Sequence, residues 1–161
     1  MLKTISNNPA DIIPTADIIL FCLPAFMVEQ TLETIKPYLS SKTIVGSVVG
    51  NTGFFIFAHK VLADQPIGLF AFQRVPYISR VVEYGKKAFL LGYKDKLLIA
   101  TEHISNPQEF CNDISMLFCT PTILLQTFYE VTLSDSNPIL HTGRLYSMWK
   151  DWNGEHYKYN S

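Results

Sequence analysis

An unbroken run of apolar residues lies near the start of the chain, from Ile18 to Leu23, without alternating polar positions. This pattern is typical of a strand that is buried on both faces, as in a parallel sheet. Pro24 ends the run, and residues 27–38 then have the apolar spacing of an amphipathic helix. The pattern therefore predicts a buried strand followed by a helix.

The same order of elements continues after this helix. A second β-rich run covers residues 43–49, and the glycine-containing segment 50–53 interrupts it. A short apolar helix is predicted over residues 54–62 and a third strand over residues 67–72. Strand, helix, strand, helix and strand in this order are typical of a βαβαβ unit with right-handed crossovers.

The pattern changes in the second half of the chain. Two short β-prone runs, residues 87–93 and 96–101, are separated by a polar turn and predict a hairpin. Asn106 is typical of an N-cap and favours a helix over residues 107–118. Residues 122–126 are again β-prone. The whole pattern predicts an α/β fold with parallel strands and a hairpin.

A last helix is predicted to begin at Asn137, which suits an N-cap, with Pro138 at the first helical position. His141 then lies one turn into the helix, where the positive end of the helix dipole favours the neutral imidazole. A neutral imidazole beside a cleft exchanges a proton at physiological pH. His141 is therefore a candidate acid/base.

The composition fits one α/β domain. The chain has 161 residues, of which 48% are apolar and 17% charged, so a sizeable core is expected. The formal net charge is -1 and the basic residues are scattered, which argues against nucleic acid or a membrane surface as a partner. No segment has the pattern of a transmembrane helix or a signal peptide.

The cysteines indicate a reducing compartment. Cys22, Cys111 and Cys119 are odd in number and have no metal-ligand spacing. Free, mostly buried thiols in the cytoplasm are expected. The histidines share no metal-ligand spacing either, so no metal site is predicted.

Three separated stretches resemble the opine dehydrogenases. Residues 17–25 are similar to the fourth strand and following loop of a dinucleotide-binding domain. Residues 73–85 resemble the Q-x-x-P-Y-x-x-R…Y-G segment of these enzymes. Residues 137–141 resemble the N-P-x-x-H that opens the helical domain of octopine and nopaline dehydrogenases. The order and spacing agree from about residue 10 onward.

The resemblance implies an NAD(P)-dependent oxidoreductase that condenses a 2-oxo acid with the amino group of an amino acid. Residues 1–134 would be the C-terminal part of a Rossmann-like domain, and residues 135–161 the start of a helical domain for substrate binding and dimerisation. The G-x-G-x-x-G fingerprint of the first βαβ unit is absent from the sequence. We therefore expect only part of the enzyme here, inactive by itself.

The resemblance also implies roles for individual residues. His141 would exchange a proton with the reacting carbonyl or amine. The planar fork of Arg80 suits a substrate carboxylate. Substrate binding is expected of Gln73, Tyr77, Arg80, Asn137 and Arg144, and cofactor binding of Leu23, Pro24, Ala25, Gly50 and Asn51.

Each of these residues also has a purely structural interpretation. Gln73 and Tyr77 would equally stabilise an irregular segment after the third strand. Arg80 and Arg144 would lie at the surface, and residues 23–25 would form a plain strand-to-helix turn. His141 would pack between domains.

Two other functions stay open. One is a non-enzymatic remnant whose fold serves as an interaction domain. The other is a relative of ketopantoate reductase, which shares the domain order but uses a lysine on its helical domain. The corresponding helix of this chain offers His141 instead, which disfavours this relationship.

The resemblance also predicts that copies of this chain associate with one another. The strand that would flank residues 18–23 in a dinucleotide-binding domain is not found in the chain, so this apolar strand is expected at a sheet edge. Met148, Trp149 and Trp152 follow the helical stripe of His141 and would lack a cover. A homodimer or a domain-swapped oligomer is therefore expected.

Overall fold

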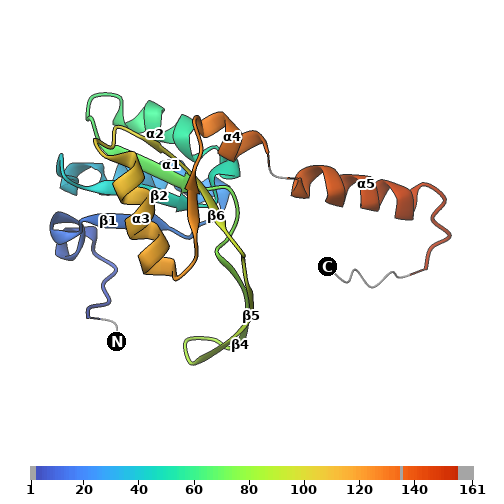
Figure 1. Ribbon diagram of the computed structural model, residues 1–161. Coiled ribbons are helices and arrows are strands. Elements are labelled where there is room, and N and C mark those ends of the chain that lie inside the picture. The colour runs from blue at the N-terminus through green and yellow to red at the C-terminus, as the bar shows by residue number, and fades with distance from the viewer. Residues whose placement is uncertain (1–2, 135, 156–161) are drawn as a thin grey trace.

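The computed structural model describes residues 3–134 and 136–155, and it contains a five-stranded sheet with helices on both faces (Figure 1). The strand order is β1-β2-β3-β6-β7. Strands β1 to β3 are parallel, and β6 is antiparallel to β3 and parallel to β7. The strands are β1 (Ile18–Phe21), β2 (Ile44–Val48), β3 (Gly68–Phe72), β6 (Leu97–Glu102) and β7 (Thr122–Leu124).

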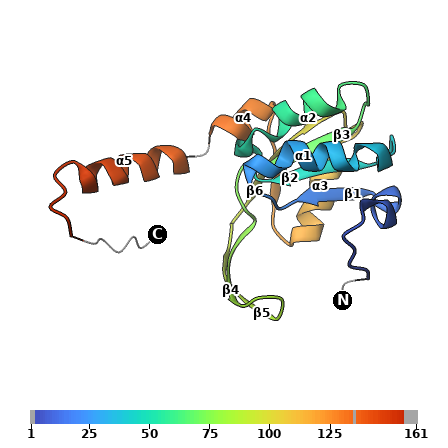
Figure 2. The ribbon, with the colours of Figure 1, turned by 180° about the vertical axis from the view of Figure 1, so that it is seen from behind.

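Two helical layers enclose this sheet (Figure 2). Helices α1, α2 and α4 pack on one face, and α3 packs on the other. Helix α5 extends away from the α/β body. The helices are α1 (Ala25–Ile35), α2 (Phe54–Leu62), α3 (Pro107–Phe118), α4 (Phe128–Leu133) and α5 (Asn137–Trp149). Short 3₁₀ turns occupy η1 (Pro9–Asp11), η2 (Ile13–Thr15), η3 (Lys36–Tyr38) and η4 (Gly50–Thr52).

The predicted βαβαβ order is confirmed, and strand β3 lies at its centre. All five positions of β3 are buried. Leu69 and Ala71 face the core under α1, α2 and α4, while Phe70 and Phe72 face the core under α3. A strand with both faces covered carries an unbroken apolar sequence, which explains why the pattern predicted it.

The predicted hairpin of residues 87–93 and 96–101 is wrong. Strand β5 (Lys87–Tyr93) pairs with β4 (Tyr77–Glu83), whereas β6 joins the main sheet beside β3. Gly85, with φ of +72°, lies in the turn between β4 and β5. Because every residue of β4 is exposed, the strand has no buried face that would mark it in the sequence.

Strand β1 is the edge strand of the described sheet, as predicted, but its burial on both faces is not confirmed. Ile18 is 39% exposed and only Phe21 is buried, because α3 covers the opposite end of the sheet.

The cysteines are free, as predicted, but Cys22 and Cys119 are exposed. Only Cys111 is buried, and this burial raises the pKa of its thiol.

The predicted helix starts and ends also differ in detail. Helix α5 has Ser136 at its N-cap position, so Asn137 is its first residue, and Trp152 lies beyond its end. Asn106 does stand at the N-cap of α3, but its side chain donates to Glu109 and does not cap the backbone. No helix of the described residues is both long and apolar enough to cross a membrane.

Two glycines allow close packing inside the body. A Cβ atom at Gly46 would lie 2.1 Å from the ring of Phe70, and one at Gly50 would lie 2.4 Å from Cγ1 of Val131. Gly50 follows β2 and lies beneath α4. A side chain at Gly50 would therefore push α4 away from the sheet.

We predict that Gly50→Ala lowers the free energy of unfolding by about 1–3 kcal/mol, the usual cost of overpacking a core. The measurement is urea denaturation followed by circular dichroism. Gly92→Ala is the matched control, because a Cβ atom at Gly92 meets nothing within 4 Å. Equal stability of the two variants would contradict the packing role of Gly50.

Candidate functional site

The predicted cofactor residues lie together at one edge of the sheet. Strands β1, β2 and β3 are parallel, so the loops that follow them meet at their carboxyl ends (Figure 1). Residues 23–25 follow β1, Gly50 and Asn51 follow β2, and residues 73–74 follow β3. Ligands of open α/β sheets bind at this edge.

The loop after β1 leads directly into helix α1. Leu23 is half-buried against the core, Pro24 stands at the N-cap position, and Ala25 is the exposed first residue of the helix. Pro24 at the N-cap offers no side-chain acceptor to the first backbone N–H groups of α1, and the N–H of Met27 donates to the carbonyl of Pro24 at 3.0 Å. These donors therefore face the carboxyl edge without a side-chain acceptor.

Two side chains that follow β3 form hydrogen bonds with the segment that leads into α5. The Gln73 Nε2 group donates to Oγ of Ser134 at 2.5 Å, and Nη2 of Arg74 donates to Oγ of Ser136 at 2.6 Å. The backbone N–H of Gln73 donates to the carbonyl of Leu98 at 2.9 Å, which fixes Gln73 against β6. We call the two side-chain contacts, Gln73–Ser134 and Arg74–Ser136, the β3–α5 clasp.

The clasp brings two of the three sequence motifs together. His141 and Arg144 are exposed on α5, and this helix begins directly after Ser136. The backbone N–H of Leu140 donates to the carbonyl of Ser136 at 2.9 Å, which joins the first turn of α5 to the clasp. Asn137 is placed in the helix, but its side chain lies outside the described part of the structure, as does Asp135 at the predicted domain boundary.

Arg74 is the residue that the sequence analysis missed. Arg74 lies within the Q-x-x-P-Y segment, beside Gln73. The residues around it in the sequence do not indicate that its partner is Ser136, 62 positions further along the chain. Gln73 contacts both Ser134 and the backbone of Leu98, and these are contacts that the structural interpretation of this residue expects.

Tyr77 and Arg80 lie on strand β4, in the projecting hairpin. The ring of Tyr77 packs against Tyr93 and Phe118, with centroid distances of 6.2 and 6.4 Å. Arg80 is exposed, and its Nη1 donates to the carbonyl of Ser79 at 3.0 Å. The hairpin and α5 leave the body as separate projections in both views (Figures 1 and 2), so the structure does not bring Arg80 to His141.

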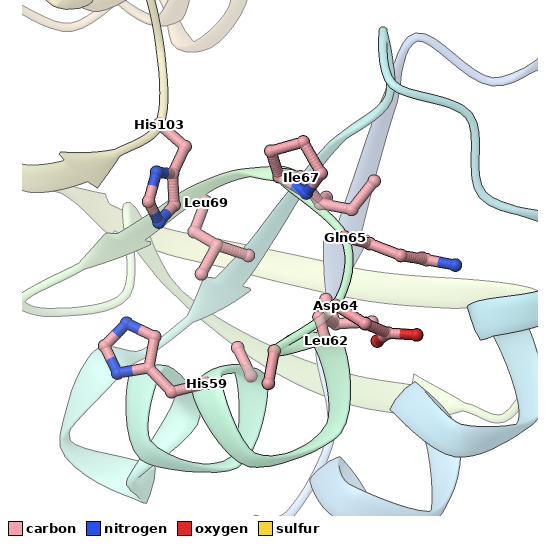
Figure 3. Close-up of a pocket in the computed structure, with 10 residues that line it drawn as sticks. His59, Leu62, Asp64, Gln65, Ile67, Leu69 and His103 are labelled. Atoms are coloured by element: carbon pink, nitrogen blue, oxygen red, sulfur yellow. The ribbon is translucent and has the colours of Figure 1, made fainter.

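A cavity of about 350 Å³ lies at the opposite edge of the sheet, between the end of α2 and the start of β3 (Figure 3). The rings of His59 and His103 lie at one side of it, and Nε2 of His59 contacts Oε2 of Glu102. The cavity contains none of the predicted site residues. No group of three or more metal-ligating side chains occurs among the described residues, here or elsewhere.

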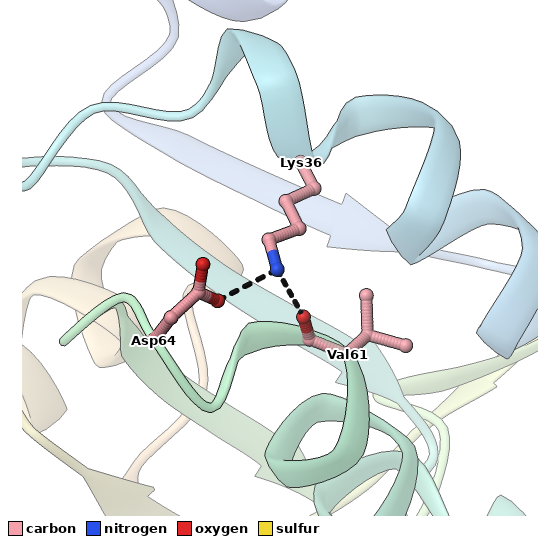
Figure 4. A network of polar contacts seen from close by, with 3 residues as sticks. All are labelled: Lys36, Val61 and Asp64. Atoms are coloured by element: carbon pink, nitrogen blue, oxygen red, sulfur yellow. Dashed lines mark hydrogen bonds and ion pairs between the residues drawn. The ribbon is translucent and has the colours of Figure 1, made fainter.

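A polar network next to this cavity has a structural role (Figure 4). Nζ of Lys36 donates to Oδ1 of Asp64 at 2.6 Å and to the carbonyl of Val61 at 2.8 Å. The hydrogen bond from Lys36 holds the pKa of the Asp64 carboxyl below its ordinary value. These contacts tie the end of α1 to the end of α2.

Comparison with known proteins supports the resemblance seen in the motifs. No family model matches the chain. The chain is 27% identical over 161 residues to an opine dehydrogenase of Haliotis discus hannai, covering 96% of this chain and 39% of the relative. It is 25% identical to an octopine dehydrogenase of Mizuhopecten yessoensis, covering 94% and 39%. The chain thus spans about two fifths of the length of these relatives.

Solved structures confirm the Rossmann-like fold. Octopine dehydrogenase in complex with NADH and agmatine has a TM-score of 0.83 and 24% identity, covering 95% of this chain and 39% of that one. A ketopantoate reductase from Ralstonia eutropha has a TM-score of 0.53 and 16% identity, covering 76% and 38%. The fold therefore matches a part of octopine dehydrogenase more closely than ketopantoate reductase.

We predict that Arg74→Ala loosens the attachment of α5, because it removes the hydrogen bond to Ser136. Spin labels at Cys22 and at Tyr146→Cys, in a Cys119→Ser background, report the distance between the body and α5. Electron–electron double resonance should give a broader distance distribution for Arg74→Ala than for the parent.

Arg80→Ala is the matched control for this experiment, since it removes a guanidinium whose hydrogen bond among the described residues goes to the neighbouring carbonyl of Ser79. The control should leave the distance distribution as narrow as in the parent. An unchanged distribution in Arg74→Ala would show that the clasp does not position α5.

Proposed function

We propose that the chain supplies the nicotinamide side and the acid/base residue of an opine-type, NAD(P)-dependent oxidoreductase. The observation that carries this proposal is the β3–α5 clasp, which joins the carboxyl edge of the parallel strands to the helix that bears His141. Similarity to opine and octopine dehydrogenases over nearly the whole chain supports it.

The carboxyl edge fits a dinucleotide. The uncapped backbone N–H groups at the start of α1 are donors for the polar groups of a cofactor. Leu23, Pro24, Ala25, Gly50 and Asn51 would hold its nicotinamide half. When bound, the cofactor supplies a hydride to the substrate carbon.

His141 would move the protons of the reaction. Condensation of a 2-oxo acid with an amine forms an imine and releases the carbonyl oxygen as water. The imidazolium of His141 would donate a proton to this oxygen, and the neutral imidazole would accept a proton from the attacking amine. Arg144, one turn further on α5, would hold an anionic group of the substrate.

The substrates are proposed by class. Octopine dehydrogenase has been solved with NADH and pyruvate and with NADH and L-arginine. We propose a 2-oxo acid and an amino acid for this chain, with Gln73 and Asn137 among the residues around them. Tyr77 and Arg80 lie on β4 of the projecting hairpin, away from α5 and His141. The free cysteines support a cytoplasmic location.

An interaction domain without activity is the second candidate. The observation that favours it is the β4–β5 hairpin, where Val81 and Leu91 are 68% and 61% exposed. Exposed apolar side chains of this kind mark binding surfaces. Replacement of His141 distinguishes the two candidate functions, because it should reduce the turnover of an oxidoreductase, whereas an interaction domain has no turnover to lose.

The first test replaces the matching segment of the Haliotis opine dehydrogenase by this chain. We expect NADH oxidation with pyruvate and an amino acid, and a loss of about 10²–10⁴-fold in His141→Ala, the usual contribution of a positioned acid/base. His103→Ala, at the opposite edge of the sheet, is the control. Circular dichroism and NADH binding verify that each chimera is folded.

A rate of His141→Ala within a few-fold of the parent chimera would contradict the acid/base role. A folded chimera that binds NADH but shows no turnover with any acidic substrate would favour the interaction domain.

The second test concerns the isolated chain. We predict that it binds NADH or NADPH more weakly than micromolar, because the glycine fingerprint that holds the pyrophosphate is absent from its sequence. Calorimetric titration measures the dissociation constant. A constant in the low micromolar range would contradict the prediction.

The third test concerns assembly. We propose a homo-oligomer that covers the β1 edge or the α5 surface, since Ile18 is 39% and Trp149 is 56% exposed. Light scattering should give more than one chain per particle, and Ile18→Lys should lower that mass. Ile5→Lys, at a position 83% exposed and outside the strands, is the control. A stable monomer at micromolar concentration would contradict the proposal.

A further inference from the structure

The cavity of about 350 Å³ between the end of α2 and the start of β3 combines an apolar lining with a few polar groups (Figure 3). Its polar side chains are His59 and His103 on one side, and Asp64 and Gln65 on the other. A cavity of this size and composition is typical of a small-molecule site. Its apolar lining includes buried side chains of the main core: Ala58, Leu62, Ile67 and Leu69.

One acceptor of this lining lacks a hydrogen-bond donor. Oε1 of Gln65 is closed off from solvent and accepts no hydrogen bond from any residue that the structure describes. A buried acceptor without a donor costs free energy, so such atoms are nearly always paired in folded proteins. A ligand N–H group that the Gln65 amide turns to meet would supply this donor. The lining therefore favours a ligand that carries N–H donors.

The charges around the cavity favour a cation. The carboxylate of Asp64 belongs to the lining, and the carboxylate of Glu102 contacts Nε2 of His59. Lys36 pairs with Asp64, so two negative charges and one positive charge leave a formal charge of −1 when the histidines are neutral. Among the described residues that line the cavity, none is a lysine or an arginine. An excess of negative charge around a hollow attracts a cation.

We propose that this cavity binds a small organic cation with an apolar body and an amidinium or ammonium head. The body would lie against Leu62 and Leu69, and the head would donate to Oε1 of Gln65. At about 30 Å³ for each water-sized group, the space holds about a dozen such groups, so one aromatic ring with an amidinium substituent fits. The cavity lies at the opposite edge of the sheet from the residues proposed for the cofactor, and its ligand does not depend on the proposed function.

The test compares three probes of one shape and different charge: benzamidine, benzamide and benzoate. Backbone amide shifts of residues 58–65 are followed by NMR as each probe is added to the whole chain at constant pH and ionic strength. We expect saturable shifts with benzamidine. Benzamide should bind about tenfold more weakly, as for the loss of a charge-assisted hydrogen bond, and benzoate more weakly still.

A variant tests the role of the unpaired acceptor. Gln65→Met removes the amide and keeps the length of the side chain, so it should weaken benzamidine binding about tenfold. Gln30→Met, at an exposed position of α1 that does not line the cavity, is the matched control and should bind as the parent does. The dispersion of the amide spectrum verifies that each variant is folded.

Three outcomes would overturn the proposal. They are an absence of saturable shifts with benzamidine, binding of benzamide or benzoate as tight as that of benzamidine, and equal binding of benzamidine by the parent and Gln65→Met. Because the assay needs neither NADH nor turnover, its outcome is independent of the activity of the chimera.

Discussion

The complete burial of strand β3 is the constraint on which the rest of the structure depends. Its side chains divide between the two cores, so neither its direction nor its register is free to change. β3 therefore ends at a fixed place after Phe72. The next two side chains, Gln73 and Arg74, are polar and reach Ser134 and Ser136 from that place.

The two halves of the candidate site are held with different strength. The edge proposed for the cofactor rests on the paired strands β1 to β3, whose backbone hydrogen bonds and buried side chains act together. The α5 side rests on the β3–α5 clasp, and a hydrogen bond of this kind contributes about 0.5–1.5 kcal/mol. The attachment of α5 is thus weaker than the strand pairing that holds the α/β body together.

The sequence predicted the first half of the fold because burial leaves a clear pattern. Strand β3 and helix α2 have unbroken or strongly apolar sequences, and both were placed within one residue of their observed bounds. Strand β4 has no buried face, so its sequence carried no such pattern. The pairing of β6 with β3 depends on contacts far apart in the chain, which local turn residues do not report.

The candidate site was predicted through its motifs and not through its contacts. His141 became a candidate because an asparagine, a proline and a histidine stand in a recognisable order at a predicted helix start, and its role stays a prediction. Arg74 was missed because its partner Ser136 lies beyond the range of any local pattern. The exposure of Cys22 was missed as well, since an apolar run does not say which of its residues lie at the end of an edge strand.

The most direct test of the account is a crystal structure of the chimera with NADH and pyruvate. We expect the nicotinamide ring over the carboxyl ends of β1 to β3. We also expect a ring nitrogen of His141 within hydrogen-bond reach of the pyruvate carbonyl oxygen, about 2.6–3.2 Å. A nicotinamide bound at another edge of the sheet, or a His141 ring turned away from pyruvate, would contradict the account.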